Sequence, residues 1–163
     1  MKHIQAPAEY VSNWKVGQHL PYSIFLAGGI SNCPDWQSIL ATMLGETPLV
    51  VINPRRKDFD ESDPNMTVEQ IAWEHRHMSK VDAIAFWFCK ETVCPITLFE
   101  YGKCLGRGGK KLFVGCEEGY TRTLDVVEQT RHENQRITVR TTPRALLQEI
   151  HDWVITDVLP NSP

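Results

Sequence analysis

Two neighbouring stretches, Ala83-Ile-Ala-Phe-Trp-Phe88 and Pro95-Ile-Thr-Leu-Phe-Glu-Tyr-Gly102, decide how this chain folds. The first is apolar throughout, as expected of a strand that is covered on both faces of a parallel sheet. The second begins with a proline, which suits the first turn of a helix, and carries one carboxylate, Glu100. The order is therefore a buried strand, a loop and a helix, and in open α/β sheets ligands bind beyond the carboxyl ends of the strands.

The same alternation of short apolar runs and amphipathic segments extends over the rest of the chain. Strands are predicted at 24–27, 49–52, 83–88, 112–115 and 137–139, and helices at 34–44, 67–80, 95–105, 124–132 and 143–158. Thr67 and Gln70 form a capping-box pattern at the start of the second helix, and Thr142 is the expected cap of the last. Five apolar strands separated by helices predict a doubly wound α/β domain with a five-stranded parallel sheet and helices on both faces.

Length and composition limit the class of protein. A chain of 163 residues suits one domain with its own core, which we place at 22–163, with 1–21 as an N-terminal extension. The net charge of −3 argues against sequence-independent binding of nucleic acid. No apolar run reaches the roughly 18 residues of a membrane span, and no secretory signal is visible, so a cytoplasmic protein is expected. Five cysteines without a C-x-x-C pair fit a reducing compartment and suggest neither a disulfide framework nor a zinc site.

Two glutamates are the candidate catalytic residues. Glu100 lies in the first turns of its helix, where the positive end of the helix dipole favours the ionised carboxylate that a nucleophile requires. Glu74 lies about two turns before the end of the preceding helix, and chemistry at a sugar carbon usually employs two carboxyl groups, one to attack and one to handle a proton. The alternatives are a helix-favouring acid for Glu100 and a surface partner of His77 for Glu74.

Further candidates follow the ends of the first three strands, whose loops meet along one edge of the sheet. The candidate substrate-binding residues are Gly28, Gly29, Ile30, Trp36, Asn53, Arg55, Trp87 and Cys94. The glycine pair permits close approach of a ligand to the backbone. An arginine pair at 55–56 suits a phosphate or carboxylate, and the tryptophans suit stacking on a base. The alternatives are solvated arginines and tryptophans that belong to the core.

Cys94 offers a competing chemistry. A cysteine at the start of a helix can have a lowered pKa and act as a nucleophile, which would make the protein a Cys94-dependent hydrolase; the alternative is a small residue that closes the loop. His75 and His77 are two residues apart on a helix and therefore point to different sides, so no metal site is predicted there. Asp82 lies at the opposite end of its strand from the expected site and is interpreted as structural.

Several motifs together resemble the nucleoside 2-deoxyribosyltransferase-like family over about residues 22–140. They are Phe25-Leu-Ala-Gly-Gly-Ile30, Cys33-Pro-Asp-Trp-Gln37, Ile52-Asn-Pro-Arg55, Trp73-Glu74 with Asp82, and Pro95-Ile-Thr-Leu-Phe-Glu-Tyr-Gly102. The resemblance implies a flavodoxin-like α/β fold and assembly as dimers or higher homo-oligomers. It implies cleavage or exchange of the base–sugar bond of deoxynucleosides, or hydrolysis of nucleoside monophosphates, with no metal or organic cofactor.

The resemblance also assigns roles. Glu100 matches the family nucleophile, whose attack on C1′ gives a glycosyl-enzyme ester. Glu74 stands eight residues before Asp82, where the family has a second carboxylate that is usually an aspartate. Cys94 replaces an aspartate that in many members acts on the base, and Ile24 or Phe25 replaces the usual tyrosine of the first strand. The C-terminal asparagine that family members lend to a neighbouring subunit has no clear match.

Besides the Cys94-dependent hydrolase, two functions remain. The first is an N-glycosyl transferase or hydrolase acting on a (deoxy)nucleoside or nucleoside monophosphate. In it Gly28, Gly29 and Ile30 line the pocket, Asn53 and Arg55 hold a polar group, and Trp36 or Trp87 packs on the base. The second is a catalytically silent module that kept the pocket and binds or senses nucleotides.

Overall fold

The computed structural model of the chain describes residues 2–10 and 22–161, which form a six-stranded sheet flanked by helices. All strand pairs are parallel, in the order β1-β3-β2-β4-β5-β6. The strands are β1 (Lys2–Gln5), β2 (Ser23–Gly28), β3 (Val50–Asn53), β4 (Ala83–Phe88), β5 (Lys111–Cys116) and β6 (Val139–Arg140). The helices are α1 (Trp36–Met43), α2 (Pro64–Lys80), α3 (Pro95–Arg107), α4 (Thr123–Glu133) and α5 (Pro143–Trp153). A π-helical turn, Val154–Val158, and a short 3₁₀ helix, Leu159–Asn161, follow α5.

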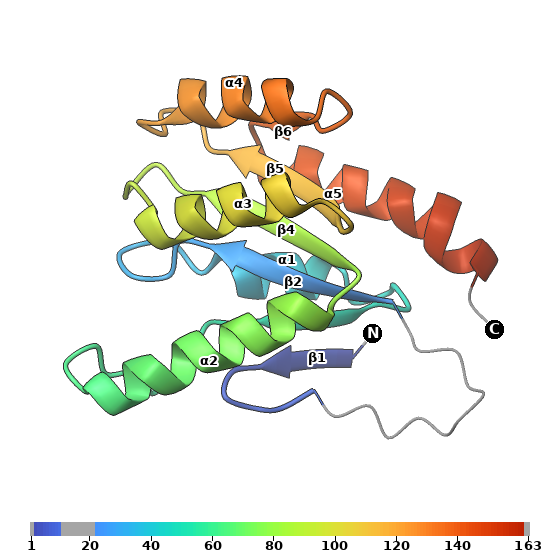
Figure 1. The fold of residues 1–163 in the computed structure, drawn as a ribbon. Helices are drawn as coiled ribbons and strands as arrows, with labels where there is room; N and C mark the ends of the chain where they lie inside the picture. The colour runs from blue at the N-terminus through green and yellow to red at the C-terminus, as the bar shows by residue number, and fades with distance from the viewer. Residues whose placement is uncertain (1, 11–21, 162–163) are drawn as a thin grey trace.

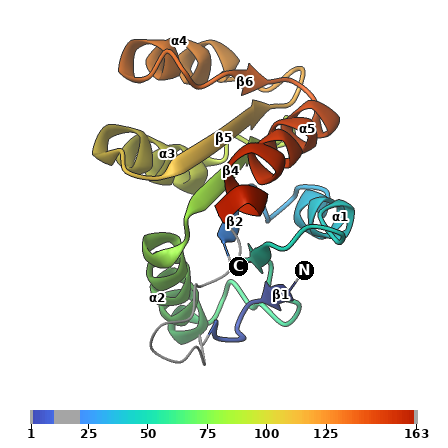
Figure 2. The ribbon, with the colours of Figure 1, turned by 90° about the vertical axis from the view of Figure 1, so that its right-hand side faces the viewer.

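The helices form two layers with the sheet between them. Helices α2, α3 and α4 cover one face, and α1 and α5 cover the other (Figures 1 and 2). Without β1, the strand order β3-β2-β4-β5-β6 is that of the flavodoxin-like class. From β2 the chain adds β3 on one side of the sheet and then β4, β5 and β6 on the other, so the order of the strands reverses between β2 and β4. This reversal leaves a crevice at the carboxyl ends of β2 and β4, where such folds bind ligands. No helix within residues 2–10 and 22–161 is long and apolar enough to cross a membrane.

The central strands are buried because helices cover both of their faces. Every residue of β4 is buried, as is β2 up to its last residue, Gly28. An apolar sequence without alternation is what this double cover requires. At the amino ends of these strands, Asp82 Oδ2 accepts hydrogen bonds of 2.8 Å from both the backbone N–H and the hydroxyl of Ser23. The structural role predicted for Asp82 is confirmed: it fastens β2 to β4 at the end of the sheet opposite the crevice.

The sheet differs from the prediction in having a sixth strand. Lys2–Gln5, within the segment interpreted as an N-terminal extension, pairs in parallel with β3 at the edge of the sheet. Only Ile4 of this strand is fully buried, so the apolar signal that marked the central strands is missing. The last strand is also shorter than expected and shifted, at Val139–Arg140. Residues 11–21 of the predicted extension lie outside the described residues.

Two helix boundaries differ from those predicted. Helix α2 begins at Pro64, one turn earlier than expected, because Asp63 is its cap and accepts a hydrogen bond of 2.9 Å from the N–H of Asn65. Thr67 is therefore inside the helix. Helix α5 begins after Thr142, whose hydroxyl oxygen accepts from the N–H of Ala145 as expected, but gives way to the π-helical turn after Trp153.

Candidate functional site

A cavity of about 420 Å³ lies at the crevice between the carboxyl ends of β2 and β4. Its walls are the loops that follow β2, β3 and β4, one side of α2, and the first turns of α3. Glycines of the loop after β2 form one wall, and Glu74 and Glu100 stand together on another. A volume of this size suits a small organic molecule with a few polar groups.

The two glutamates come from different helices and interact electrostatically. Both are only partly exposed, and both line the cavity. Burial, followed by repulsion from Glu74, raises the pKa of Glu100 to about 7. Burial also raises the pKa of Glu74, against the effect of a hydrogen bond donated by Gln70. Desolvation and the second carboxyl group oppose the effect of the helix dipole, so Glu100 holds its proton to a higher pH than an exposed glutamate does.

This pair resists ionisation of both carboxyl groups at once, because the two charges would repel each other. Around neutral pH it can hold one proton between two carboxyl groups, which leaves one of them anionic and the other acidic. This is the arrangement that enzymes use when one carboxylate attacks or stabilises a cationic centre and another moves a proton.

Gln70 is a site residue that the sequence assigned only to a helix cap. Its side-chain N–H₂ donates to the carbonyl of Pro54 at 2.8 Å and to Glu74 Oε1 at 2.8 Å. These two acceptors fix the orientation of the amide. Its Oε1 is buried without a hydrogen-bond partner among the described residues, and the residue lines the cavity. A donor on a ligand would satisfy this oxygen. The signal in the sequence was the spacing of four from Glu74, which places both on one side of the helix.

Arg56, rather than Arg55, lines the cavity. Its guanidinium is paired with Asp58 at 3.1 Å and with Glu69 at 3.5 Å, both of which are exposed acids. Phe59 of the same loop also lines the cavity. The sequence marked both members of the arginine pair but could not tell which of the two points into the site.

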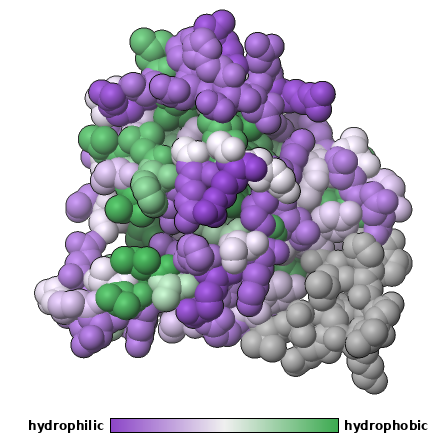
Figure 3. Space-filling model, in the orientation of Figure 1, coloured by the Kyte–Doolittle hydropathy of each residue, from purple (hydrophilic) through white to green (hydrophobic). Residues whose placement is uncertain are grey.

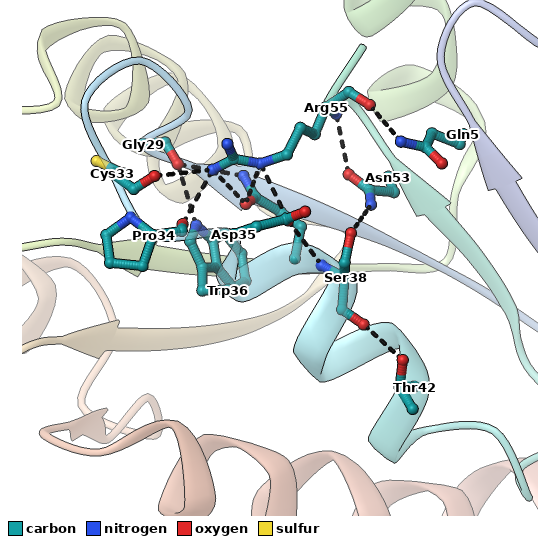
Figure 4. A network of polar contacts seen from close by, with 11 residues as sticks. Gln5, Gly29, Cys33, Pro34, Asp35, Trp36, Ser38, Thr42, Asn53 and Arg55 are labelled. Atoms are coloured by element: carbon teal, nitrogen blue, oxygen red, sulfur yellow. Dashed lines mark hydrogen bonds and ion pairs between the residues drawn. The ribbon is translucent and has the colours of Figure 1, made fainter. Parts of the chain in front are cut away.

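Arg55 instead supports the loop after β2 (Figure 4). Its guanidinium donates to the carbonyl oxygens of Cys33 and Pro34 and to the side chain of Gln37, and it pairs with Asp35 at 3.0 Å. Asn53 completes this network from β3: its Oδ1 accepts from the N–H of Arg55 at 2.9 Å. Asn53 is fully buried. Neither residue lines the cavity, so the substrate contact proposed for each is replaced by a role in positioning the loop.

The tryptophans also lie outside the cavity. Trp36 is 7% exposed and donates from Nε1 to the carbonyl of Gly29 at 3.1 Å. Trp87 is 2% exposed and packs against Gly115, where an added Cβ would come within 2.4 Å of its ring. Both belong to the core, as the alternative interpretation held. Stacking of either ring on a base is therefore not supported by their placement.

The remaining candidates of the glycine loop do border the cavity. Gly28, Gly29 and Ile30 line it, as predicted. A Cβ at Gly28 would lie 2.4 Å from the carbonyl oxygen of Trp87 and 2.5 Å from the ring of Trp36. Only glycine therefore fits at this position.

Cys94 also lines the cavity, at the start of α3, with a left-handed backbone of φ 48°. Its N–H donates to the hydroxyl of Thr92 at 2.9 Å. Its sulfur contacts Thr92, the carbonyl of Cys89 and the side chain of Cys33, and among the described residues none of its contacts is with an imidazole. The partner that a cysteine nucleophile needs is thus missing from the contacts of Cys94.

A second cavity, of about 360 Å³, lies on the other side of the glutamate pair, between α2 and α3. Glu74 and Glu100 line both cavities. His75 borders this second cavity, whereas His77 is buried, stacks on Trp73 and contacts its carbonyl oxygen at 2.8 Å. The two histidines therefore lie in different surroundings.

Exposed hydrophobic side chains surround the openings of both cavities. They gather over α2 and α3 (Figure 3). Ile71 is 60%, Ile96 65% and Phe99 70% exposed, and Val68 lies beside them at 65%. A patch of this kind marks a surface that contacts a partner or a ligand.

The fold and the carboxylate pair define a class: a flavodoxin-like α/β protein with two coupled acids in a cavity at its topological switch point. Residues 21–120 match the family model described as "Nucleoside 2-deoxyribosyltransferase like". The chain belongs to this family, and membership indicates glycosyl transfer on a small-molecule nucleoside as the class of chemistry. A search of curated proteins gives no match to the chain.

Proposed function

We propose that the protein cleaves the base–sugar bond of a (deoxy)nucleoside or nucleoside monophosphate, as a transferase or a hydrolase, with Glu100 as the nucleophile. The observation that carries this proposal is the coupled pair of Glu100 and Glu74 in the wall of a cavity at the carboxyl ends of β2 and β4. Family membership supplies the class of substrate.

In the proposed reaction, the ionised carboxylate of Glu100 attacks C1′ of the sugar. A C–O bond forms to C1′ as the C–N bond to the base breaks, and the base leaves with the electron pair of that bond and takes up a proton. Water, or the nitrogen of a second base, then attacks C1′ and releases Glu100. Two displacements at one carbon retain its configuration. Glu74 positions the sugar or Glu100, or carries a proton between steps.

Two further residues suit the recognition of such a substrate. The Oε1 of Gln70, which has no partner within residues 2–10 and 22–161, can accept a hydrogen bond from a hydroxyl of the sugar or an N–H of the base. A ligand without such a donor would leave this oxygen unpaired and would bind less well. Arg56 supplies a guanidinium at the cavity wall, which suits a phosphate. Its exposed acidic partners can be exchanged for the phosphate oxygens. We therefore propose that Arg56, and not Arg55, binds the polar end of the substrate.

The test measures, by chromatography, the release of free base from a panel of nucleosides and nucleoside monophosphates, with and without an acceptor base. Wild type is compared with Glu100→Gln and with Cys94→Ser. Release that is lost in Glu100→Gln and kept in Cys94→Ser supports the proposal, and a new nucleoside formed from the acceptor identifies a transferase. Equal release by wild type and Glu100→Gln would refute the glutamate mechanism.

A second function is a catalytically silent module that binds or senses nucleotides. The observation that favours it is Cys94, which occupies the cavity wall at the position where many family members carry an acid that acts on the base. A nucleotide that raises the midpoint temperature of unfolding, Tm, without any base release would support this function. Inactivation by a thiol-alkylating reagent that is prevented in Cys94→Ser would instead indicate a cysteine-dependent hydrolase.

Assembly into a homo-oligomer remains a prediction. What supports it is the exposed apolar patch over α2 and α3 at the mouths of both cavities, which a second copy would cover. Replacing Phe99, which is 70% exposed, by aspartate should then lower the molar mass measured by light scattering. An unchanged mass would place any subunit contact elsewhere.

A further inference from the structure

Three thiols, those of Cys33, Cys89 and Cys94, lie close together beside the cavity at the carboxyl ends of β2 and β4. Cys33 lies in the loop after β2, Cys89 follows β4 directly, and Cys94 precedes α3. Because β2 and β4 are neighbours in the sheet, their following loops converge. The sulfurs of Cys33 and Cys89 lie within 4.8 Å of each other. A Cβ added to Gly29 would lie 2.4 Å from the sulfur of Cys33 and 3.0 Å from that of Cys94.

A carboxylate completes the cluster. The two sulfurs of Cys33 and Cys89 and a carboxylate oxygen of Glu91 all lie within 4.8 Å of one another. Zn–S bonds of about 2.3 Å and Zn–O bonds of about 2.0–2.2 Å place the ligands of a tetrahedral zinc ion roughly 3.5–3.8 Å apart. The cluster thus needs only a small contraction to surround an ion, and two thiolates with one carboxylate are a ligand set for zinc rather than for magnesium or calcium.

We propose that Cys33, Cys89 and Glu91 bind a thiophilic divalent cation of the zinc type at the edge of the cavity. Binding would deprotonate both thiols, and their protons would pass to solvent. A tetrahedral ion takes a fourth ligand, which water or the neighbouring thiol of Cys94 would supply. This site is separate from the Glu74–Glu100 pair and takes no part in the proposed chemistry.

The surroundings hold two of these ligands in place. The guanidinium of Arg55 donates to the carbonyl oxygen of Cys33, while the sulfur of Cys33 points away from that network (Figure 4). Cys89 is 1% exposed and continues directly from a central strand. Glu91 is exposed on the loop between β4 and α3, so it can turn toward an ion without disturbing the core. Supporting contacts of this kind orient ligands before the metal arrives.

An ion at this position would join the loop after β2 to the loop that leads into α3. Both loops carry residues of the cavity wall, Gly29 and Cys94. Occupancy should therefore raise the resistance of the fold to heat, since an ion that binds only the folded state stabilises it.

The test uses the full-length protein kept reduced with a phosphine, and Co²⁺ as a spectroscopic probe. Titration should produce a thiolate-to-cobalt charge-transfer band that saturates at one ion per chain and disappears when Zn²⁺ is added. Cys33→Ser should weaken binding by at least about tenfold, and Glu91→Gln should weaken it as well. Cys104→Ser is the matched control, because Cys104 is a partly exposed thiol that lies outside the cluster, and it should leave the titration unchanged.

Thermal unfolding gives a second, independent measurement. Zn²⁺ should raise the Tm of wild type and of Cys104→Ser but not of Cys33→Ser. Absence of the charge-transfer band, or a band of undiminished affinity in Cys33→Ser, would overturn the proposal. If circular dichroism shows that Cys33→Ser does not fold, Glu91→Gln provides the same test at an exposed position. Undiminished affinity for Co²⁺ in Glu91→Gln would show that Glu91 is not a ligand and would overturn the proposed ligand set.

Discussion

Replacing Glu100 by glutamine should stabilise the protein, and more so as the pH rises. Burial and the neighbouring Glu74 raise the pKa of Glu100 from 4.5 to about 7. Below pH 4.5 the carboxyl is protonated in both the folded and the unfolded chain, so it carries no penalty. Between these two pKa values the unfolded chain releases the proton first, and the free energy of unfolding falls as the pH rises. A neutral amide of nearly the same shape avoids this loss.

The magnitude follows from the shift. Each pKa unit corresponds to about 1.36 kcal/mol, so wild type should lose roughly 3 kcal/mol of stability relative to Glu100→Gln by pH 8, and under about 1 kcal/mol at pH 5. For a domain of this size, 1 kcal/mol changes Tm by roughly 2–4 °C. The two proteins should thus differ in Tm by roughly 6–12 °C at pH 8.

The assay is urea unfolding of both proteins at pH 5, 6, 7 and 8, followed by circular dichroism. Glu133→Gln, at an exposed position on α4, controls for loss of a carboxylate as such. A stability difference that does not change with pH, or a wild type more stable than Glu100→Gln at pH 8, would refute the reasoning.

Three other results are expected. Glu74→Gln removes the charge that repels the ionised form of Glu100, so the acid limb of kcat/KM should move to lower pH; an unchanged limb in a pH–rate profile would contradict this coupling. Arg56→Ala should reduce kcat/KM for nucleoside monophosphates more than for nucleosides, whereas equal losses in parallel assays would argue against phosphate binding by Arg56. Asp82→Ala leaves the N–H and hydroxyl of the buried Ser23 without their acceptor. It should lower the free energy of unfolding by about 1–3 kcal/mol in urea titrations, and a loss within error would show that Asp82 does not fasten the strands.

The coupling between the two glutamates links stability to the proposed activity. An ionised nucleophile beside a second carboxyl group in a partly buried site is unfavourable in the folded state. The same unfavourable interaction keeps the pKa of Glu100 near 7, where the group changes its protonation state around neutral pH. Stability and activity are therefore in conflict at this position, and a variant such as Glu100→Gln is expected to be more stable and inactive.

The apolar runs of the sequence were sufficient to predict the class of fold. Strands such as 83–88 are buried on both faces, and that burial leaves an unmistakable pattern in the residues themselves. The edge strand Lys2–Gln5 leaves no such pattern, because only Ile4 is fully buried in it. Likewise, the positions of Glu100 and Glu74 on their helices, together with the family motifs, predicted both as candidates, and both line the cavity.

Tertiary structure decided which side chains reach the cavity and how they are charged. Arg55 and Arg56 are neighbours in sequence, yet one supports the loop after β2 and the other lines the cavity. Trp36 and Trp87 are near the predicted site in sequence but belong to the core. The raised pKa of Glu100 and the meeting of Cys33 with Cys89 both depend on distances between separate elements. Spacing along the chain fixes which face of an element a residue occupies, but only packing fixes what that face meets.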